Sequence, residues 1–160
     1  LLRREIEKLS AYARGRSVVA ADVKLLLSVP DSENIFEFLD AISAKNAKKA
    51  AETLHREIEA GGGPQSVIYQ LIRQFRTMLA LRDCLDRNPR ENDANILAKK
   101  IGAHPFVVKK TLDSLNNFTK GEIKSVLDDL LGLDRSIKNG TRSEEVAFDL
   151  FLSGLLARKS

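Results

Sequence analysis

Apolar residues recur at a spacing of three and four along almost the whole chain, which predicts amphipathic α-helices. The first helix is expected to end at Gly15, and a short second helix over residues 20–27 is closed by Pro30. Asn34 and Asn46 can cap the third and fourth helices, because their side-chain oxygens accept hydrogen bonds from free backbone N–H groups. The pattern therefore predicts an all-α fold.

The clearest break in this pattern is the run Gly61-Gly62-Gly63-Pro64. Glycine commonly ends a helix, and proline suits the first turn of the next one. We therefore expect two units, a bundle of three or four helices over residues 1–60 and a larger helical bundle over residues 61–160.

The last helix of the second unit differs from the others. Ser143 is a suitable cap for it, and Thr119 with Glu122 forms a capping-box signature at the start of the preceding helix. Apolar residues cover nearly all of the circumference of the last helix: Val146, Ala147, Phe148, Leu150, Phe151, Leu152, Leu155 and Leu156. Such a helix is either central in its own domain or buried against another chain, and the pattern leaves both possibilities open.

The composition is that of a globular helical protein, with 43% hydrophobic and 30% charged residues and no Trp. A single cysteine, Cys84, cannot form a disulfide within the chain. No apolar run approaches the roughly 20 residues that cross a bilayer, and no signal peptide is present, so we expect a cytoplasmic location and no membrane contact. The chain opens inside a helical pattern without an initiator Met, which indicates a piece of a larger protein.

The net charge of +4 is unevenly distributed. Residues 1–60 hold ten Lys and Arg against ten Asp and Glu, whereas residues 61–160 hold sixteen against twelve. Such an excess attracts phosphate, but solvated helix faces have the same composition.

No pattern in the chain predicts catalysis. The glycine run is followed by Gln65 and Ser66 in place of the Lys and Thr of a phosphate-binding loop. His55, His104 and Cys84 lie on separate elements without metal-ligand spacing. We therefore expect no catalytic residue, no metal and no cofactor.

Residues 96–118 have the spacing of a helix-turn-helix at Ala98, Gly102 and Val108, where a small residue and a glycine are expected to let the two helices pack tightly. Lys109 and Lys110 are then exposed on the second helix. They can contact phosphate, but the helix lacks the Arg, Asn or Gln residues that usually reach base edges. A helix-turn-helix DNA-binding regulator is the alternative hypothesis for this chain.

Five motifs occur in order along the sequence: Glu5–Leu9 with Val18–Val23, Asn34–Ala41, Gly63–Arg76, His104–Lys110 and Leu133–Gly140. In this order they resemble the delta-subunit family of bacterial DNA polymerase III, the clamp-loader subunit that opens the sliding clamp. The resemblance spans nearly the whole chain and leaves out the family's N-terminal AAA+-like domain.

The resemblance implies an AAA+ lid-like bundle over residues 1–60 and a clamp-loader collar domain over residues 61–160. It implies a non-catalytic accessory subunit of a DNA-directed DNA polymerase complex. The implied partners are the gamma/tau and delta-prime subunits through the collar, the sliding clamp through the missing domain, and primer-template DNA in weak, sequence-independent contact.

The resemblance also suggests candidate site residues. The apolar last helix becomes a candidate subunit interface through Phe148, Phe151, Leu152 and Leu155. The candidate DNA contacts are Lys109 and Lys110 on the second helix of the helix-turn-helix, and Lys138 and Arg142 around the helix end at Gly140. At Gly140 a solvated loop without DNA contact is the simpler interpretation.

Overall fold

The computed structural model describes residues 32–61 and 63–158, and every regular element in this part of the chain is an α-helix. The all-α prediction is confirmed. The first two predicted helices and the start of the chain lie outside the described residues. The helices are α3 (Ser32–Ser43), α4 (Ala47–Gly61), α5 (Pro64–Arg87), α6 (Ala94–Ile101), α7 (Pro105–Leu115), α8 (Lys120–Lys138) and α9 (Glu144–Arg158).

Most predicted helix boundaries are confirmed. Thr119 and Glu122 form the reciprocal capping box at the start of α8, and Pro64 occupies the first turn of α5. The side chain of Asn46 accepts from the Lys49 N–H at 3.0 Å, and Ser143 Oγ accepts from the Val146 N–H at 3.4 Å.

The prediction that Asn34 caps a helix is wrong. α3 begins at Ser32, and Asn34 Nδ2 donates to Glu57 Oε2 of α4 at 2.6 Å. Glu57 is 4% exposed, and its other carboxylate oxygen accepts from Gln70 Nε2 at 3.1 Å. A buried carboxylate needs hydrogen-bond donors. Asn34 therefore donates to Glu57 in the tertiary structure and does not have the capping role that local sequence had predicted.

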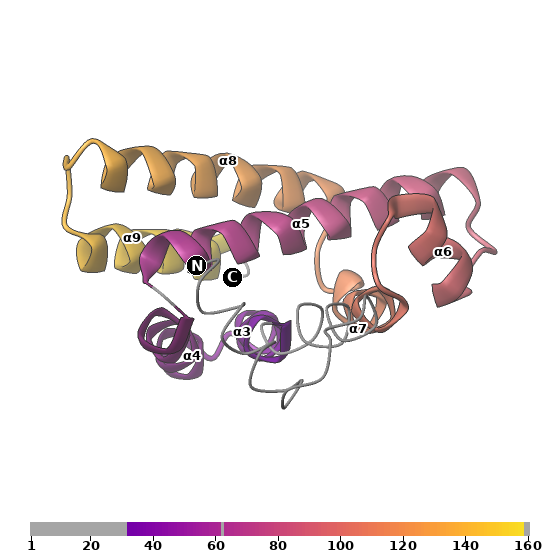
Figure 1. Ribbon diagram of the computed structural model, residues 1–160, viewed down its shortest axis with the longest axis horizontal. Helices are drawn as coiled ribbons and strands as arrows, with labels where there is room; N and C mark the ends of the chain where they lie inside the picture. The colour runs from indigo at the N-terminus through magenta and orange to yellow at the C-terminus, as the bar shows by residue number, and fades with distance from the viewer. Residues whose placement is uncertain (1–31, 62, 159–160) are drawn as a thin grey trace, which may run out of the picture. The chain divides into compact units, whose positions relative to one another are not determined.

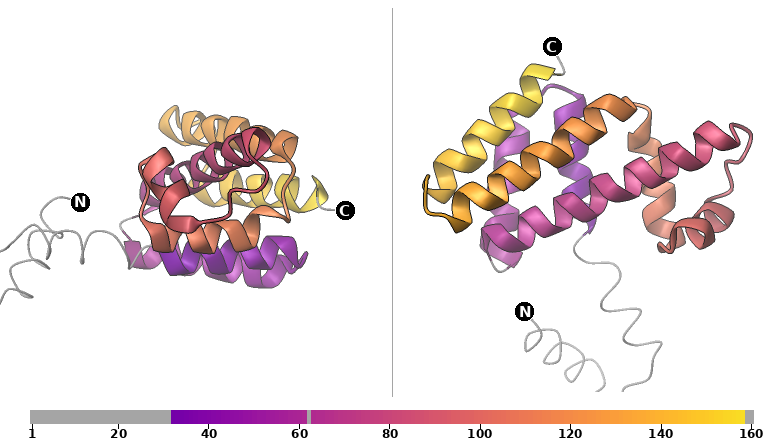
Figure 2. Two further views of the ribbon diagram at one scale, coloured as in Figure 1. Left: turned by 90° about the vertical axis from the view of Figure 1, so that its right-hand side faces the viewer. Right: turned by 90° about the horizontal axis from the view of Figure 1, so that it is seen from above.

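The long helix α5 is the centre of the arrangement (Figure 1). It packs against α8 along one side and contacts α4, α6 and α7. The helix α8 runs back antiparallel to α5, and α9 returns beside α8 as the second arm of a hairpin (Figures 1 and 2). The short pair α6 and α7 lies at the C-terminal end of α5, away from the α8–α9 turn (Figure 2).

Residues from Asn34 onward form one compact unit with a continuous hydrophobic core. Its largest fully buried side chains include Phe38 of α3, Phe75 of α5 and Phe118, and the last two stack edge to face with ring centroids 5.8 Å apart. The core therefore extends across the break at Gly61–Pro64. The division of the chain at residue 60 stays a prediction, since most of its first bundle lies outside the described residues.

Candidate interaction surfaces

The four side chains predicted to form a subunit interface on α9 face the interior of this chain. Phe148 is 2% exposed and Leu155 1%, and the core also contains Phe151 and Leu152. Of the two possibilities that the sequence left open, the position of α9 favours a helix central in its own domain. A subunit contact through these four side chains stays a prediction, and it would require them to leave this core.

A different set of apolar side chains on the α8–α9 hairpin faces solvent. Leu150 is 50% exposed, Val146 49% and Leu131 of α8 43%. Val146 and Leu150 lie one turn apart on the same face of α9. The sequence already showed the apolar circumference of α9, but periodicity could not show which of its sides would remain uncovered.

A groove of about 380 Å³ lies between α8 and α9, and Leu150 is one of the residues that line it. Its apolar lining comes from Leu133, Ala147 and Phe151. Gly132 of α8 and Gly154 of α9 also line the groove. A Cβ atom built on either glycine would meet no atom within 4 Å. The packing of α8 on α9 therefore does not require glycine at either position.

The groove is bordered by charged side chains. Arg158 donates to Asp129 at 2.5 Å, and this hydrogen bond raises the pKa of the guanidinium above its usual range. Arg142 lines the same groove and is exposed. The hairpin thus presents a groove in which apolar and charged side chains lie together, and a protein interface combines the same two kinds of side chain.

The four candidate DNA-contacting cations do not form one patch. Lys109 and Lys110 are exposed on α7, whereas Lys138 and Arg142 lie at the α8–α9 turn. Since α8 extends about 28 Å between these regions, the two pairs lie at opposite ends of the described unit (Figure 1). Lys138 also donates to Asp134 at 2.7 Å, which leaves Arg142 as the freer cation at that end.

The junction of α5, α7 and α8 is held by polar side chains that sequence reasoning missed. Arg82 of α5 donates to the carbonyl oxygens of Leu115 and Phe118 at 2.8 Å each, and so fixes the end of α7. Gln74 donates to Thr111 of α7 at 2.9 Å, and both side chains are buried. No local pattern reports these contacts, because the partners lie more than 30 positions apart.

Lys120, at the start of α8, bridges two carboxylates of α5. Its ammonium lies 2.5 Å from Asp83 Oδ1 and 2.9 Å from Asp86 Oδ2. The hydrogen bond from Lys120 lowers the pKa of Asp83, and the two carboxylates together raise the pKa of Lys120. The three side chains are exposed, so the bridge between Lys120 and the two carboxylates orients α8 on α5 but contributes little to stability.

The helices α6 and α7 form the predicted helix-turn-helix shape. Ala98 and Val108 are buried, as their spacing indicated. Gly102 adopts φ +67° at the end of α6, and a Cβ there would meet no atom within 4 Å. The turn requires glycine for its left-handed backbone and not for close helix packing, which corrects the reason inferred from the sequence.

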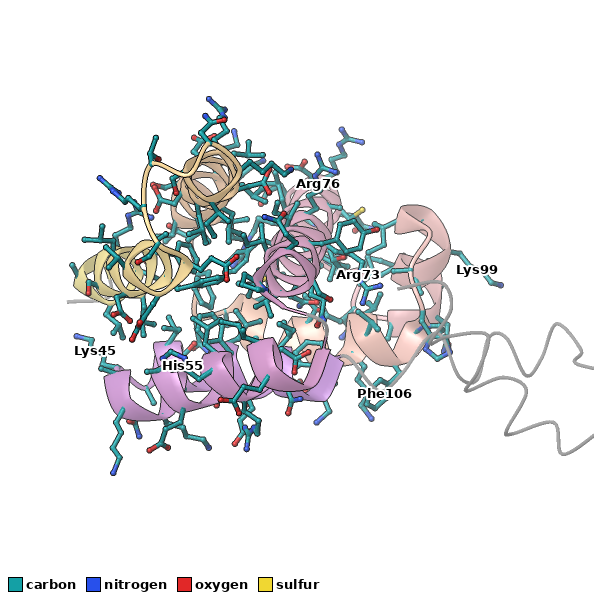
Figure 3. The ribbon with its side chains drawn as sticks, turned by 60° about the vertical axis from the view of Figure 1, so that its left-hand side comes forward. Lys45, His55, Arg73, Arg76, Lys99 and Phe106 are labelled. Atoms are coloured by element: carbon teal, nitrogen blue, oxygen red, sulfur yellow. The ribbon has the colours of Figure 1, made fainter. Side chains whose placement is uncertain are left out.

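The two histidines have separate positions. His104 caps α7, where Nδ1 accepts from the Phe106 N–H at 3.2 Å, and His55 is exposed on α4 (Figure 3). Within residues 32–61 and 63–158, no three His, Cys, Asp or Glu side chains are grouped closely enough to hold a metal ion. In the same part of the chain, no helix has both the length and the apolar character to cross a membrane.

Residues 32–155 match the family described as DNA polymerase III delta subunit, C-terminal domain. The chain belongs to this family. The match includes α6 and α7, so the helix-turn-helix shape is part of a delta C-terminal domain and a separate DNA-binding regulator is not favoured.

Two curated relatives of this delta-family domain are named as delta subunits. The chain is 24% identical over 155 residues to the DNA polymerase III subunit delta of Bacillus subtilis, covering 96% of this chain and 44% of the relative. It is 25% identical over 136 residues to the probable DNA polymerase III subunit delta of Aquifex aeolicus, covering 83% and 38%. The chain thus spans less than half the length of either relative.

A solved structure has the same fold. The Bacillus subtilis DNA clamp loader delta protein matches 96% of this chain and 45% of its own, with a TM-score of 0.71 and 24% identity.

Proposed function

We propose that this chain is the non-catalytic C-terminal part of a clamp-loader delta subunit, which assembles with the gamma/tau and delta-prime subunits to load the sliding clamp during DNA replication. Membership of the delta family supports the assembly role. The observation that carries the proposal is the pair of exposed apolar side chains, Val146 and Leu150, at the groove of the α8–α9 hairpin, since α9 keeps them in solvent although its other side lies in the core.

The neighbouring subunit contacts the groove through Leu150, which lines it, and contacts Val146 one turn away on α9. Exposed apolar side chains that cluster next to a concave surface are typical of protein interfaces. The interface then depends indirectly on the buried side of α9, because packing in the core holds this helix in position through Phe148, Phe151, Leu152 and Leu155. The proposed interface therefore lies on the opposite side of α9 from the four side chains that the sequence pattern suggested.

Gly132 and Gly154 support this location. A glycine inside a helix is less favourable than alanine by about 1 kcal/mol, and neither glycine is needed for packing within this chain. Glycines that line an open groove allow a second helix to approach closely. The groove therefore fits a helix from a neighbouring subunit.

The proposed role includes weak, sequence-independent contact with primer-template DNA through Lys109 and Lys110 at one end and Arg142, with Lys138, at the other. The exposure of the two α7 lysines supports phosphate contact. Lys109→Ala with Lys110→Ala should weaken duplex binding equally for all sequences and flatten its salt dependence. A preference for one duplex sequence would argue instead for base readout.

Size-exclusion chromatography of this chain mixed with the gamma/tau and delta-prime subunits tests the assembly. We expect a complex that is lost in the variant Val146→Glu with Leu150→Glu. Ile96→Glu is the matched control, because Ile96 is also an exposed apolar side chain (44%) but lies on α6. The proposal fails if the wild-type chain forms no complex, or if the control disrupts the complex as strongly as the α9 variant.

A further inference from the structure

The outer face of α5 carries a stripe of three side chains, Tyr69, Arg73 and Arg76, which we name the α5 stripe. They are spaced by four and three residues, so they lie on one face of the helix over about 10 Å. Tyr69 is 66% exposed, the highest value among the large apolar side chains of residues 32–61 and 63–158, and both arginines are exposed. Arg73 and Arg76 project from α5 in Figure 3.

The arginines of the α5 stripe have no acidic partner in the described part of the chain. Between Pro64 and Leu81 they are the only charged residues, so no carboxylate lies one turn away on α5. The nearest acidic residues along the helix, Asp83 and Asp86, are occupied by Lys120. Two like charges three residues apart weaken a helix slightly, and nothing in the described unit offsets this repulsion.

The chemistry of the α5 stripe fits a polyanion better than a protein surface. A stable protein interface has a buried apolar centre, whereas this face offers a single aromatic ring followed by two arginines. Arginine binds phosphate through its planar guanidinium group, and an exposed tyrosine ring provides a surface on which an unpaired base can stack.

We propose that the α5 stripe binds single-stranded DNA, with Arg73 and Arg76 on the phosphates and Tyr69 against a base. This site goes beyond the proposed function, which places DNA contacts on α7 and at the α8–α9 turn, and it does not depend on subunit assembly.

Fluorescence anisotropy of the 160-residue chain with labelled oligothymidylate and with a duplex of equal length tests the site. Arg73→Ala with Arg76→Ala should weaken binding of the single strand at least tenfold at low salt. It should also reduce the salt slope by about 1.4, since each single-strand phosphate contact contributes about 0.7. Tyr69→Ala should cost at least fivefold, and Tyr69→Phe should retain binding.

The matched control is Lys45→Ala with Lys99→Ala, which removes the same charge from exposed positions on the α3–α4 turn and on α6 (Figure 3). We expect a change of less than about threefold. Equal losses in the stripe variant and the control would overturn the site, because binding would then follow net charge alone.

Two further outcomes would also overturn the site. One is duplex binding as tight as single-strand binding with no effect of Tyr69. The other is unchanged DNA binding while the stripe variants fail to join gamma/tau and delta-prime, which would identify a protein surface. Because the DNA assay contains no other subunit, its failure leaves the collar proposal standing, and failure of the collar mixture leaves this site standing.

Discussion

The α5–α7–α8 junction and the α8–α9 hairpin hold α8 from its two ends in different ways. At the junction, polar side chains reach across helices and are matched with partners: Arg82 with two carbonyl oxygens, Gln74 with Thr111, and Lys120 with two carboxylates. At the hairpin, contact depends on buried apolar side chains of α9, and further apolar side chains remain in solvent.

This difference indicates which end of the unit has apolar surface left to bury. At the junction the Arg82 Nε atom is buried without a partner, but the other polar groups named above are paired. Another chain would have to replace these hydrogen bonds, so it would gain little there. A hairpin with exposed leucine and valine beside an open groove can still bury apolar surface, and that burial favours association. The comparison therefore supports the proposal that assembly uses the hairpin, whereas the junction orients the helices.

The largest expected effect is at the buried side of α9. Phe148→Ala should lower the free energy of unfolding by about 3–5 kcal/mol, because it leaves a cavity in the core. Urea denaturation measures this, with Leu150→Ala on the exposed side of the same helix as the control, for which less than about 1 kcal/mol is expected. Similar losses in both variants would contradict the assignment of one side of α9 to the core and the other to a partner.

The polar junction should respond less strongly. Arg82→Ala should cost about 1–3 kcal/mol, because the carbonyl oxygens of Leu115 and Phe118 lose their donor. Arg87→Ala on the same helix is the control, since Arg87 is exposed, and a change within about 0.5 kcal/mol is expected. If Arg82→Ala is as harmless as the control, the junction is not held by this arginine.

Replacing the glycines of the groove should have opposite effects on the stability of the fold and on its affinity for neighbouring subunits. Gly132→Ala and Gly154→Ala should each raise the free energy of unfolding by about 0.5–1 kcal/mol, because alanine favours helix and its Cβ has open space. The same methyl groups enter the groove, so affinity for the neighbouring subunits should fall. Thermal unfolding and titration with gamma/tau measure the two effects. A loss of stability in either variant would show that the glycine serves packing inside the chain.

The smallest effect concerns the pH dependence of the Lys120 bridge. Because the pKa of Asp83 is lowered, its contribution is present above the ordinary value of 3.8 and is lost as the pH falls through the folded-state pKa. The contribution of Lys120, whose pKa is raised, is present below 10.5 and is lost as the pH rises through its folded-state pKa.

The stability difference between wild type and Lys120→Gln should therefore be constant from pH 6 to 8 and should shrink below about pH 4. Chemical denaturation at several pH values measures it. Lys99→Gln, at an exposed position on α6, serves as the control and should show no such narrowing. A difference that persists in acid would mean that Lys120 acts through packing and not through Asp83.

The sequence by itself determined the helical class, most helix ends and the family. Periodicity locates helices because each apolar stripe must face a core, and caps such as Thr119 and Asn46 satisfy backbone groups within a few residues. Local sequence predicted the wrong role for Asn34, because its side chain donates to Glu57, which lies 23 positions away.

Only the tertiary structure decided which side of α9 is buried and which polar side chains join the helices. A helix that is apolar all round has no preferred side until its neighbours are in place, so Phe148 and Leu150 look equivalent in the sequence and differ in the fold. The same holds for Arg73 and Arg82, two arginines of one helix. The position of α7 provides carbonyl oxygens to Arg82, while Arg73 remains exposed to solvent.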